Sequence, residues 1–462
     1  MNISYPKSAS GKALLIRLDE SGSTRLIERP KKADELRVKS GKKKNITRRM
    51  LHTLARRVVR SARSHNASVI AIEYSDFVFA HLDLSDEEIG SLLAQNFCMA
   101  DFEFRKFKTA PKDGWKSIQT IEVQNAPAEA KRGFSEGLLI GEYVNHCREL
   151  ADSPAGDMTP KILAREARAL SKGLPITVRS FGRAQLTKMK MGAVLGVAKG
   201  SREEPQFIVM EYTGGAKNEK PIVFIGKGVT FDTGGINIKT GDSSLGMHLD
   251  MSGGAAVIAA IALIARLEVK RNVVALIPAV ENMTAGESYR PGDILRSLSG
   301  KTIEVINTDA EGRVILADAL TYAERYKPQL VVDVATLTGG SLAALGQQAN
   351  AFFATDDELR QKIWELSEES GDYAWPLPLW SEYEALIKSS RADLANLATK
   401  GNTRYGDVTN AAAFLWQFAK KYPWVHIDIA PRMTTVPSDE LAAGAAGSPV
   451  RLLYRIANEY RE

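Results

Sequence analysis

Acidic side chains that follow two apolar segments are the residues most able to do chemistry. Asp232 lies in a glycine-rich loop after one such segment, and Asp309 and Glu311 follow another within NTDAEGR (307–313). If that segment is extended, Asp309, Glu311 and Arg313 project to one side, because alternate residues of a strand share a face. Carboxylates held together are costly unless a cation balances their charge. Because magnesium, manganese and zinc accept carboxylate ligands, the pattern predicts a metal centre.

The surroundings of these acids favour a binding site over a solvated surface loop. Their flanking segments are apolar, and the glycines between them allow close approach of the backbone and unusual dihedral angles. A phosphate site is the alternative for a glycine-rich loop, but neither GxGxxG nor GxxxxGK[ST] follows the strands. The acids would also repel a phosphate unless a metal bridged them. The glycines are Gly226, Gly228, Gly234, Gly235, Gly241 and Gly312.

The elements that must position the acids alternate between apolar strands and apolar helices. Buried strands separated by helices predict a largely parallel sheet that is covered on both faces. In such a sheet, ligand sites lie beyond the carboxyl ends of the strands, and the acids are found there. The predicted strands are 221–227, 272–280, 302–307 and 330–336, and the clearest helices are 253–267 and 314–326.

The first part of the chain has the pattern of a separate, smaller α/β domain without a catalytic constellation. A helix is expected after Asn45, followed by the strand SVIAIEYSDF, and Ser85 with Glu88 forms a capping box at the start of another helix. A further strand is expected from Trp115. We therefore predict an α/β protein with a small N-terminal α/β domain at 1–125, a linking helix at 126–158 and a larger catalytic domain at 159–462, built on a central, mostly parallel sheet covered by helices.

Length and composition indicate a soluble globular protein. The 462 residues exceed one ordinary core, and 44% hydrophobic with 25% charged residues is a usual balance. No apolar run reaches the roughly 18–20 residues of a membrane span, and the amino terminus lacks the apolar core of a signal peptide. The two cysteines, Cys98 and Cys147, cannot form a disulfide framework. We therefore expect a cytoplasmic protein with no membrane partner.

Excess positive charge lies early in the chain. The net charge is +6, and the run 29–49 reads RPKKADELRVKSGKKKNITRR. Such a run can contact nucleic acid, although the ordinary interpretation is a solvated loop. Strong salt dependence of DNA binding would distinguish the two.

The sequence lacks the signatures of two common hydrolase classes. There is no GxSxG motif of a serine hydrolase. The histidines form no HExxH spacing. His248 lies two residues before Asp250, and we expect a structural or supporting role for it rather than metal ligation.

An ordered series of motifs resembles the leucyl aminopeptidase family of cytosolic two-metal peptidases. The motifs are NTDAEGR (307–313), GKGVTFDTGGINIK (226–239), DMSGGAA (250–256), ENM to RPGD (281–293) and ATLTGG (335–340). NTDAEGR is the most specific of them. Weaker similarity runs from about Arg148 to the C-terminus, whereas the preceding residues match only in size and α/β character. The resemblance therefore covers about two-thirds of the chain.

This resemblance implies a two-metal centre that holds zinc or manganese. Lys227, Asp232, Asp250 and Glu311 would hold the tightly bound ion, and Asp232, Asp309 and Glu311 the more exchangeable one. A hydroxide that bridges the two ions would attack the peptide. A lysine can bind a metal only as the neutral amine, so we expect Lys227 to be neutral on the metal and Lys239 to be charged.

The resemblance also implies roles for residues around the metals. Lys239 would stabilise the tetrahedral intermediate, and Arg313 would position a bicarbonate that acts as general base. The implied protein is a metallo-aminopeptidase that removes leucine-like residues from peptides and assembles as a homohexamer. Gly312 and Leu337 would lie at the bicarbonate, and the substrate pocket would comprise Met247, Asn307, Thr336, Gly339, Ala430 and Met433.

A few positions depart from the family's pattern. Thr240 and Thr284 stand where proline is usual. Pro431 and Arg432 follow Ala430 where glycine and a small or apolar residue are expected, which bears on the side-chain preference. Every implied ligand and both implied catalytic residues are present, which argues against a catalytically inactive relative.

Overall fold

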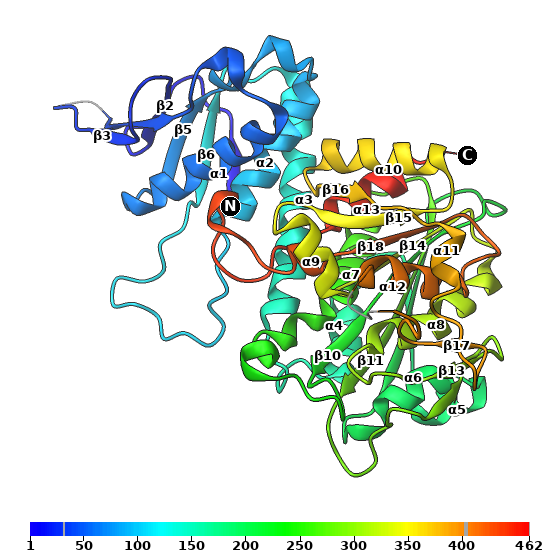
Figure 1. Cartoon of the computed structure of the whole chain (residues 1–462). Helices are drawn as coiled ribbons and strands as arrows, with labels where there is room; N and C mark the ends of the chain where they lie inside the picture. The colour runs from blue at the N-terminus through cyan, green and yellow to red at the C-terminus, as the bar shows by residue number, and fades with distance from the viewer. Residues whose placement is uncertain (31–32, 402–404, 462) are drawn as a thin grey trace. The chain divides into compact units, whose positions relative to one another are not determined.

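The computed structural model describes residues 1–30, 33–401 and 405–461 (Figure 1). Contacts divide these residues into two compact units. The first unit comprises Met1–Asn145 with Thr435–Gly444, and the second comprises His146–Thr434 with Ala445–Glu462. The division falls within one 25-residue helix, α3 (Ala128–Asp152), in the region where a linking helix is predicted.

The first unit is built on a six-stranded sheet with the order β1-β6-β5-β2-β4-β3. Its neighbouring strands run parallel except for β3 and β4, which form an antiparallel pair. The helices α1 (Arg48–Ser64) and α2 (Asp86–Asp101) pack against each other. The strands are β1 (Asn2–Ser4), β2 (Leu14–Asp19), β3 (Arg25–Ile27), β4 (Glu35–Lys39), β5 (Val69–Glu73) and β6 (Thr120–Gln124).

Local signals explain where the elements of the first unit begin. The predicted capping box is present, with Ser85 and Glu88 bonding each other's backbone N–H at the start of α2. The strand predicted from Trp115 is wrong in its first residues, because β6 begins only at Thr120. Before that point the Arg105 guanidinium lies over the Trp115 ring, 4.7 Å from its centroid.

Part of the basic run 29–49 is used within the first unit. Arg29 and Arg37 both pair with the buried carboxylate of Glu35, with Arg37 Nε 2.9 Å from Glu35 Oε1. Lys31 and Lys32 lie outside the described residues. Some of the positive charge therefore stabilises the sheet rather than facing a partner.

The second unit is built on a nine-stranded sheet whose main path is β16-β15-β18-β14-β9-β11-β8-β7, with β10 paired to β11. The central strands β18, β14, β9, β11 and β10 run parallel to one another. The pairs β15 with β18, β11 with β8, and β8 with β7 are antiparallel. The predicted α/β fold with a mostly parallel sheet is confirmed. The strands are β7 (Ile176–Phe181), β8 (Gln206–Thr213), β9 (Ile222–Gly226), β10 (Gly228–Asp232), β11 (Asn272–Asn282), β14 (Leu330–Ala335), β15 (Asn350–Ala354), β16 (Ala374–Pro376) and β18 (Trp424–Asp428).

Helices pack on this sheet in two groups. Helix α7 contacts β9, β11 and β14 together with α4 and α13, and α8 contacts β9 and β11 together with α6 and α12. The helices are α4 (Pro160–Leu170), α5 (Arg183–Met189), α6 (Gly192–Val197), α7 (Ser252–Arg266), α8 (Glu311–Ala323), α9 (Gly339–Leu345), α10 (Asp357–Ser370), α11 (Ser381–Glu384), α12 (Asp407–Trp416) and α13 (Val450–Glu459). Two short 3-10 helices next to the strand ends are η6 (Met247–Met251) and η8 (Ala430–Arg432).

Helix α7 is apolar around its whole circumference because it is a core helix. Among the described residues, Gly241–Arg266 is the one segment that is long and apolar enough to cross a membrane. However, 89% of its most apolar window is buried inside the protein. A helix buried on all sides needs no polar face, which accounts for its composition.

Two predicted segments near the acids differ from the structure. The strand predicted at 302–307 is reduced to β13 (Thr302–Glu304), and it belongs to a separate three-stranded sheet with β12 (Ile294–Arg296) and β17 (Leu394–Ala395). An apolar run alone does not reveal which sheet a strand joins. Asp232 is not in a loop but ends β10, which pairs with β11 beside the main path of the sheet.

Candidate functional site

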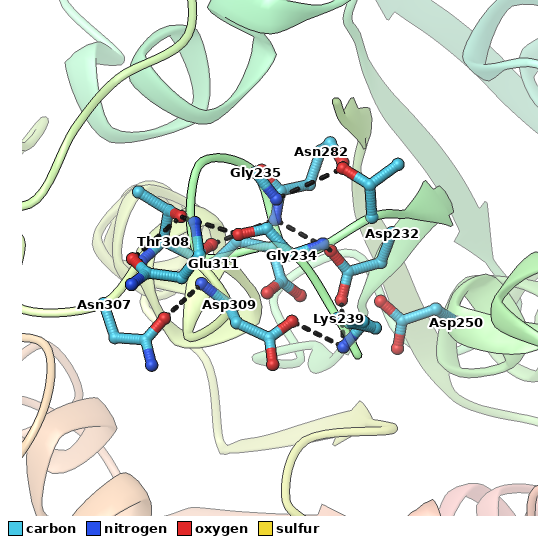
Figure 2. Close-up of polar contacts among 12 residues, drawn as sticks. Asp232, Gly234, Gly235, Lys239, Asp250, Asn282, Asn307, Thr308, Asp309 and Glu311 are labelled. Carbon is cyan, nitrogen blue, oxygen red and sulfur yellow. Dashed lines mark hydrogen bonds and ion pairs between the residues drawn. The ribbon is translucent and has the colours of Figure 1, made fainter. Parts of the chain in front are cut away.

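The predicted metal ligands come from separate segments that meet at the carboxyl ends of the central strands (Figure 2). Lys227 directly follows β9, and Asp232 is the last residue of β10. Asp250 lies in η6, which leads into α7. Asp309 lies in a turn, and Glu311 is the first residue of α8. The parallel strands thus bring together side chains that are far apart in sequence, as expected for this kind of sheet.

Three of these acids form a compact cluster. One carboxylate oxygen from each of Asp232, Asp309 and Glu311 lies within 4.8 Å of the other two. Asp232 and Glu311 are buried, whereas Asp309 reaches the surface. Within the described part of the chain, this is the one group of three or more histidine, cysteine, aspartate or glutamate side chains that could hold a metal ion.

The segment that carries Asp309 and Glu311 is a turn followed by a helix, so the extended conformation considered for it is wrong. Asn307 Oδ1 accepts a hydrogen bond of 2.8 Å from Asp309 N, and α8 begins at Glu311. Asparagine stabilises such turns by bonding the backbone two residues ahead. The turn and the helix start nevertheless bring both acids within reach of Asp232.

Lys227 contributes a buried positive charge to the site. Its Nζ lies 2.9 Å from Asp250 Oδ1 and 2.8 Å from Glu311 Oε1, and it donates a 2.8 Å hydrogen bond to the carbonyl of Thr336. Burial lowers the pKa of this ammonium, but the charges of Asp250 and Glu311 raise the pKa more, so the net shift is upward. A divalent ion at the same carboxylates would act in the opposite direction and favour the neutral amine.

Lys239 lies against a different pair of acids. Its Nζ is 2.8 Å from Asp232 Oδ2 and 2.5 Å from Asp309 Oδ1 (Figure 2). Burial lowers the pKa of Lys239, and the negative charges around it, led by that of Asp232, raise the pKa more. This side chain is more exposed than that of Lys227, at 14% against 4%.

The buried acids carry more negative charge than the lysines neutralise. Four carboxylates face the two ammonium groups. Burial raises the pKa of Glu311, and the charge of Asp232 raises it further against the opposing effect of Lys227. Burial likewise raises the pKa of Asp250. A bound cation would favour the ionised form of both acids.

Oxygen atoms without hydrogen-bond donors point to the same conclusion. Among the described residues, Asp250 Oδ2 and Glu311 Oε2 are buried and accept no hydrogen bond, and Glu311 Oε1 has only its ion pair with Lys227. Leaving a buried acceptor unpaired costs roughly 1–3 kcal/mol, and more for a charged group. Carboxylate oxygens with free lone pairs are suitable ligands for divalent cations. The donor set therefore fits a divalent metal.

Asn282 and Thr308 hold the turn against the end of β10. Asn282 Nδ2 donates to Asp232 Oδ1 at 2.7 Å and to the Thr308 carbonyl at 3.0 Å. Thr308 Oγ1 donates to the Gly234 carbonyl at 2.6 Å, and the Tyr289 hydroxyl donates to the Thr308 carbonyl at 2.7 Å. Sequence reasoning did not assign roles to these residues. Asn282 and Thr308 lie within quoted motifs, which was the available signal, whereas Tyr289 had none.

Arg313 and its neighbours form the predicted bicarbonate position. The buried Arg313 donates from Nη1 to the Asn396 carbonyl at 3.1 Å and lies 3.4 Å from Asp407 Oδ1 through Nη2. Its Nε has no hydrogen-bond partner among the described residues. A Cβ at Gly312 would lie 2.8 Å from Lys227 Nζ and 3.0 Å from Leu337 Cδ1, so a larger residue there would displace the ends of these side chains.

The predicted pocket residues lie on segments that flank the acids. Met247 is in η6 beside Asp250, and Asn307 begins the turn before Asp309. Thr336 Oγ1 donates a 2.6 Å hydrogen bond to Asp250 Oδ1, so this pocket residue contacts a predicted metal ligand directly. The remaining three are Gly339 at the start of α9, Ala430 at the start of η8, and Met433 directly after η8. Helices α9 and η8 contact each other.

A sheet of parallel strands with buried carboxylates beyond its carboxyl ends is the arrangement of a metal-dependent enzyme. The chain belongs to the cytosol aminopeptidase family, whose catalytic domain matches residues 145–454. The family predicted from the motifs is therefore confirmed. The protein is an aminopeptidase, a hydrolase of a divalent-metal family.

Curated relatives support the same family. A probable cytosol aminopeptidase of Methylobacillus flagellatus is 44% identical over 356 residues, which cover 76% of this chain and 70% of that protein. A probable cytosol aminopeptidase of Azoarcus sp. is 46% identical over 347 residues, covering 75% of this chain and 68% of the relative. Among solved structures, the bottromycin maturation enzyme BotP in complex with Mn matches with a TM-score of 0.85 and 30% identity, covering 97% of this chain and 99% of that one.

Proposed function

We propose that this aminopeptidase removes leucine-like N-terminal residues from unblocked peptides with the help of two divalent ions. The observation that carries the proposal is the cluster of Asp232, Asp309 and Glu311, whose oxygens lie within 4.8 Å of one another. Glu311 Oε2 and Asp250 Oδ2, which are buried and accept no hydrogen bond among the residues described, support it.

The proposed ligands are those that the resemblance implied. Lys227, Asp232, Asp250 and Glu311 would hold one ion, and Asp232, Asp309 and Glu311 the other. When bound, two such ions lower the pKa of a shared water and supply a hydroxide nucleophile at neutral pH. Zinc and manganese are the proposed metals, and the relative solved with Mn supports manganese as a starting choice.

Two basic residues have proposed roles beyond metal binding. Lys239 carries its charge on the more exposed side of the acids, where an ammonium can stabilise the negative oxygen that develops during attack on a carbonyl. Arg313, with Gly312 and Leu337, would hold a bicarbonate that accepts a proton. The support for this role is the buried Nε of Arg313, which makes no hydrogen bond within the described part of the chain.

The proposed substrate pocket is the basis for the proposed preference for leucine-like residues. Met247 and Met433 supply flexible apolar side chains that adapt to unbranched or branched aliphatic groups. Asn307, Thr336, Gly339 and Ala430 complete the proposed pocket. Holding the N-terminal residue there places the first peptide bond beside the acid cluster.

Assembly, location and nucleic-acid binding are separate proposals. We propose a cytoplasmic homohexamer, because oligomers of one chain form with closed symmetry and the family resemblance implies six copies. Light scattering at micromolar concentration tests this, and a monomer would refute the assembly without affecting the chemistry. DNA binding through the run 29–49 has no support beyond charge, and a salt titration of binding tests it.

The test of the proposed reaction compares Leu-Gly-Gly with its N-acetylated form. A free α-amine can bind a metal or an acidic group, whereas an acetylated nitrogen is a poor ligand and adds bulk. We expect leucine to be released from the free peptide only, measured by chromatography. Efficient cleavage of the acetylated peptide would contradict exopeptidase activity.

A further inference from the structure

Asp428 is a fully buried acid that neither the predicted metal ligands nor the predicted catalytic residues include. It is the last residue of β18, and its exposed fraction is 0%. Strand β18 lies beside β14 in the parallel centre of the sheet, and Asp428 is in register with Ala335, the last residue of β14 (Figure 1). Its carboxylate therefore lies at the carboxyl edge of the sheet, where the two segments of the proposed pocket begin.

The Asp428 carboxylate accepts hydrogen bonds from both of these segments. Its Oδ1 accepts from Leu337 N at 3.0 Å and from Ala430 N at 3.1 Å. Its Oδ2 accepts from the Thr338 hydroxyl at 2.6 Å. We call the two segments 336–339 and 430–433 the walls of the proposed pocket. Leu337 and Thr338 belong to the first wall, and Ala430 begins the second. One carboxylate thus ties both walls together.

We propose that Asp428 is a positioning residue that fixes the separation of the two pocket walls and thereby sets which N-terminal side chains the enzyme prefers. The inference rests on the proposed function, because it requires that these segments form the side-chain pocket. A buried carboxylate that accepts backbone N–H groups is held strongly, since hydrogen bonds to charged groups contribute more than neutral ones. The Asp428 carboxylate therefore restrains the positions of both segments.

The first residue of the wall 336–339 is held by contacts with proposed metal ligands. Thr336 donates to Asp250 Oδ1 at 2.6 Å, and the Thr336 carbonyl accepts from Lys227 Nζ at 2.8 Å. Loss of the Asp428 carboxylate would release Leu337, Thr338 and Ala430 but leave these two contacts in place. The inference therefore predicts altered selectivity with unaltered metal binding, a combination that a general loss of stability would not produce.

The test measures kcat/KM for leucine and alanine p-nitroanilides in the metal-loaded enzyme, together with metal content. In Asp428→Ala, we expect the leucine-to-alanine ratio to fall about tenfold, the scale of a changed fit in an apolar pocket, with metal content unchanged. Asp428→Asn should keep the ratio within about twofold of the unmodified enzyme. The amide oxygen can still accept both backbone hydrogen bonds that Oδ1 receives, and the amide nitrogen can donate to the Thr338 hydroxyl, so all three contacts persist.

Asp333→Asn is the matched control. Asp333 is equally buried, lies on the neighbouring strand β14, and accepts hydrogen bonds from Trp424 Nε1 and His426 Nδ1 at 2.6 Å each. It touches neither pocket wall through a hydrogen bond of its side chain in the described residues, so this variant should lose stability without changing the ratio.

Three results would overturn the role of Asp428. These are an unchanged ratio in Asp428→Ala, an equal change in Asp333→Asn, or a loss of metal that accounts for the effect. If Asp428→Ala does not fold, Thr338→Val removes the bond to Oδ2 together with the 3.1 Å bond that Thr338 Oγ1 accepts from Ser341 N. An unchanged ratio in that variant overturns the inference. An unmodified enzyme that cleaves both anilides equally would instead refute the proposed pocket, and the inference with it.

Discussion

Asn282 offers a sharp test of how the metal centre is supported. It is fully buried, and its side-chain amide donates to Asp232 Oδ1 at 2.7 Å and to the Thr308 carbonyl at 3.0 Å. The first bond orients a proposed bridging ligand, and the second holds the turn that carries Asp309 (Figure 2). Asn282→Ala removes both bonds while leaving every proposed ligand in the chain.

The size of the effect follows from these two bonds. Losing a hydrogen bond to a charged acceptor costs about 1.5–3 kcal/mol, and losing one to a neutral carbonyl costs about 0.5–1.5 kcal/mol. Residues that support metal ligands in this way typically contribute about 10–100-fold in metal affinity. We therefore expect Asn282→Ala to bind manganese or zinc about 10–100-fold more weakly, with a matching loss of activity at limiting metal.

The assay is a competition titration with a chromogenic chelator, made on protein shown to be folded by circular dichroism. Asn350→Ala is the control, because Asn350 is also fully buried and its side-chain amide donates a 2.9 Å hydrogen bond to Ser448 Oγ rather than to one of the acids. It should lose stability but keep its metal affinity. Equal metal affinity in the two variants would refute the idea that Asn282 orients Asp232.

Three further predictions concern the acid cluster, its lysines and the core. Glu311→Ala should lose most activity and bind less metal, measured by kinetics and elemental analysis, and near-normal turnover would remove Glu311 from the site. Lys239→Ala should keep its metal but lose about 100-fold or more in kcat. Loss of metal in this variant would show that Lys239, and not Lys227 alone, binds the metal. His426 is buried and bonded to Asp333; burial lowers its pKa, but Asp333 raises the pKa more, so the folded pKa lies above 6.5. The pair of protonated His426 and Asp333 therefore stabilises the protein below pH 6.5, and this contribution is lost as pH rises through the folded pKa. In chemical denaturation, the free energy of unfolding of His426→Gln should differ from that of the unmodified protein more at pH 6 than at pH 9.

The parts of the fold that the sequence predicts are those with strong local patterns. The apolar runs at 221–227, 272–280 and 330–336 correspond to β9, β11 and β14, since buried parallel strands need apolar residues on both faces. The helix at α2 is marked by its capping box of Ser85 and Glu88. Motifs that contain Asp232 and Glu311 predict the family because their residue types and order are specific.

The parts that the sequence does not predict depend on contacts between distant segments. The run 302–307 has the composition of a core strand, yet β13 pairs with β12 and β17 in another sheet. No local pattern encodes that choice. Likewise, Asn282 bonds to Asp232, which is 50 positions away in the sequence. Asp428 bonds to Leu337, which is 91 positions away. Such supporting residues are recognised only when the strands are assembled.

Metal stoichiometry with activity is the measurement that tests the central claim most directly. The protein is stripped with a chelator, titrated with manganese or zinc, and followed by native mass spectrometry and by hydrolysis of leucine p-nitroanilide. The two-metal site predicts that the stripped protein is inactive, that two ions bind per chain, and that activity returns as the sites fill. Full activity in the chelator with no bound ion would contradict the account.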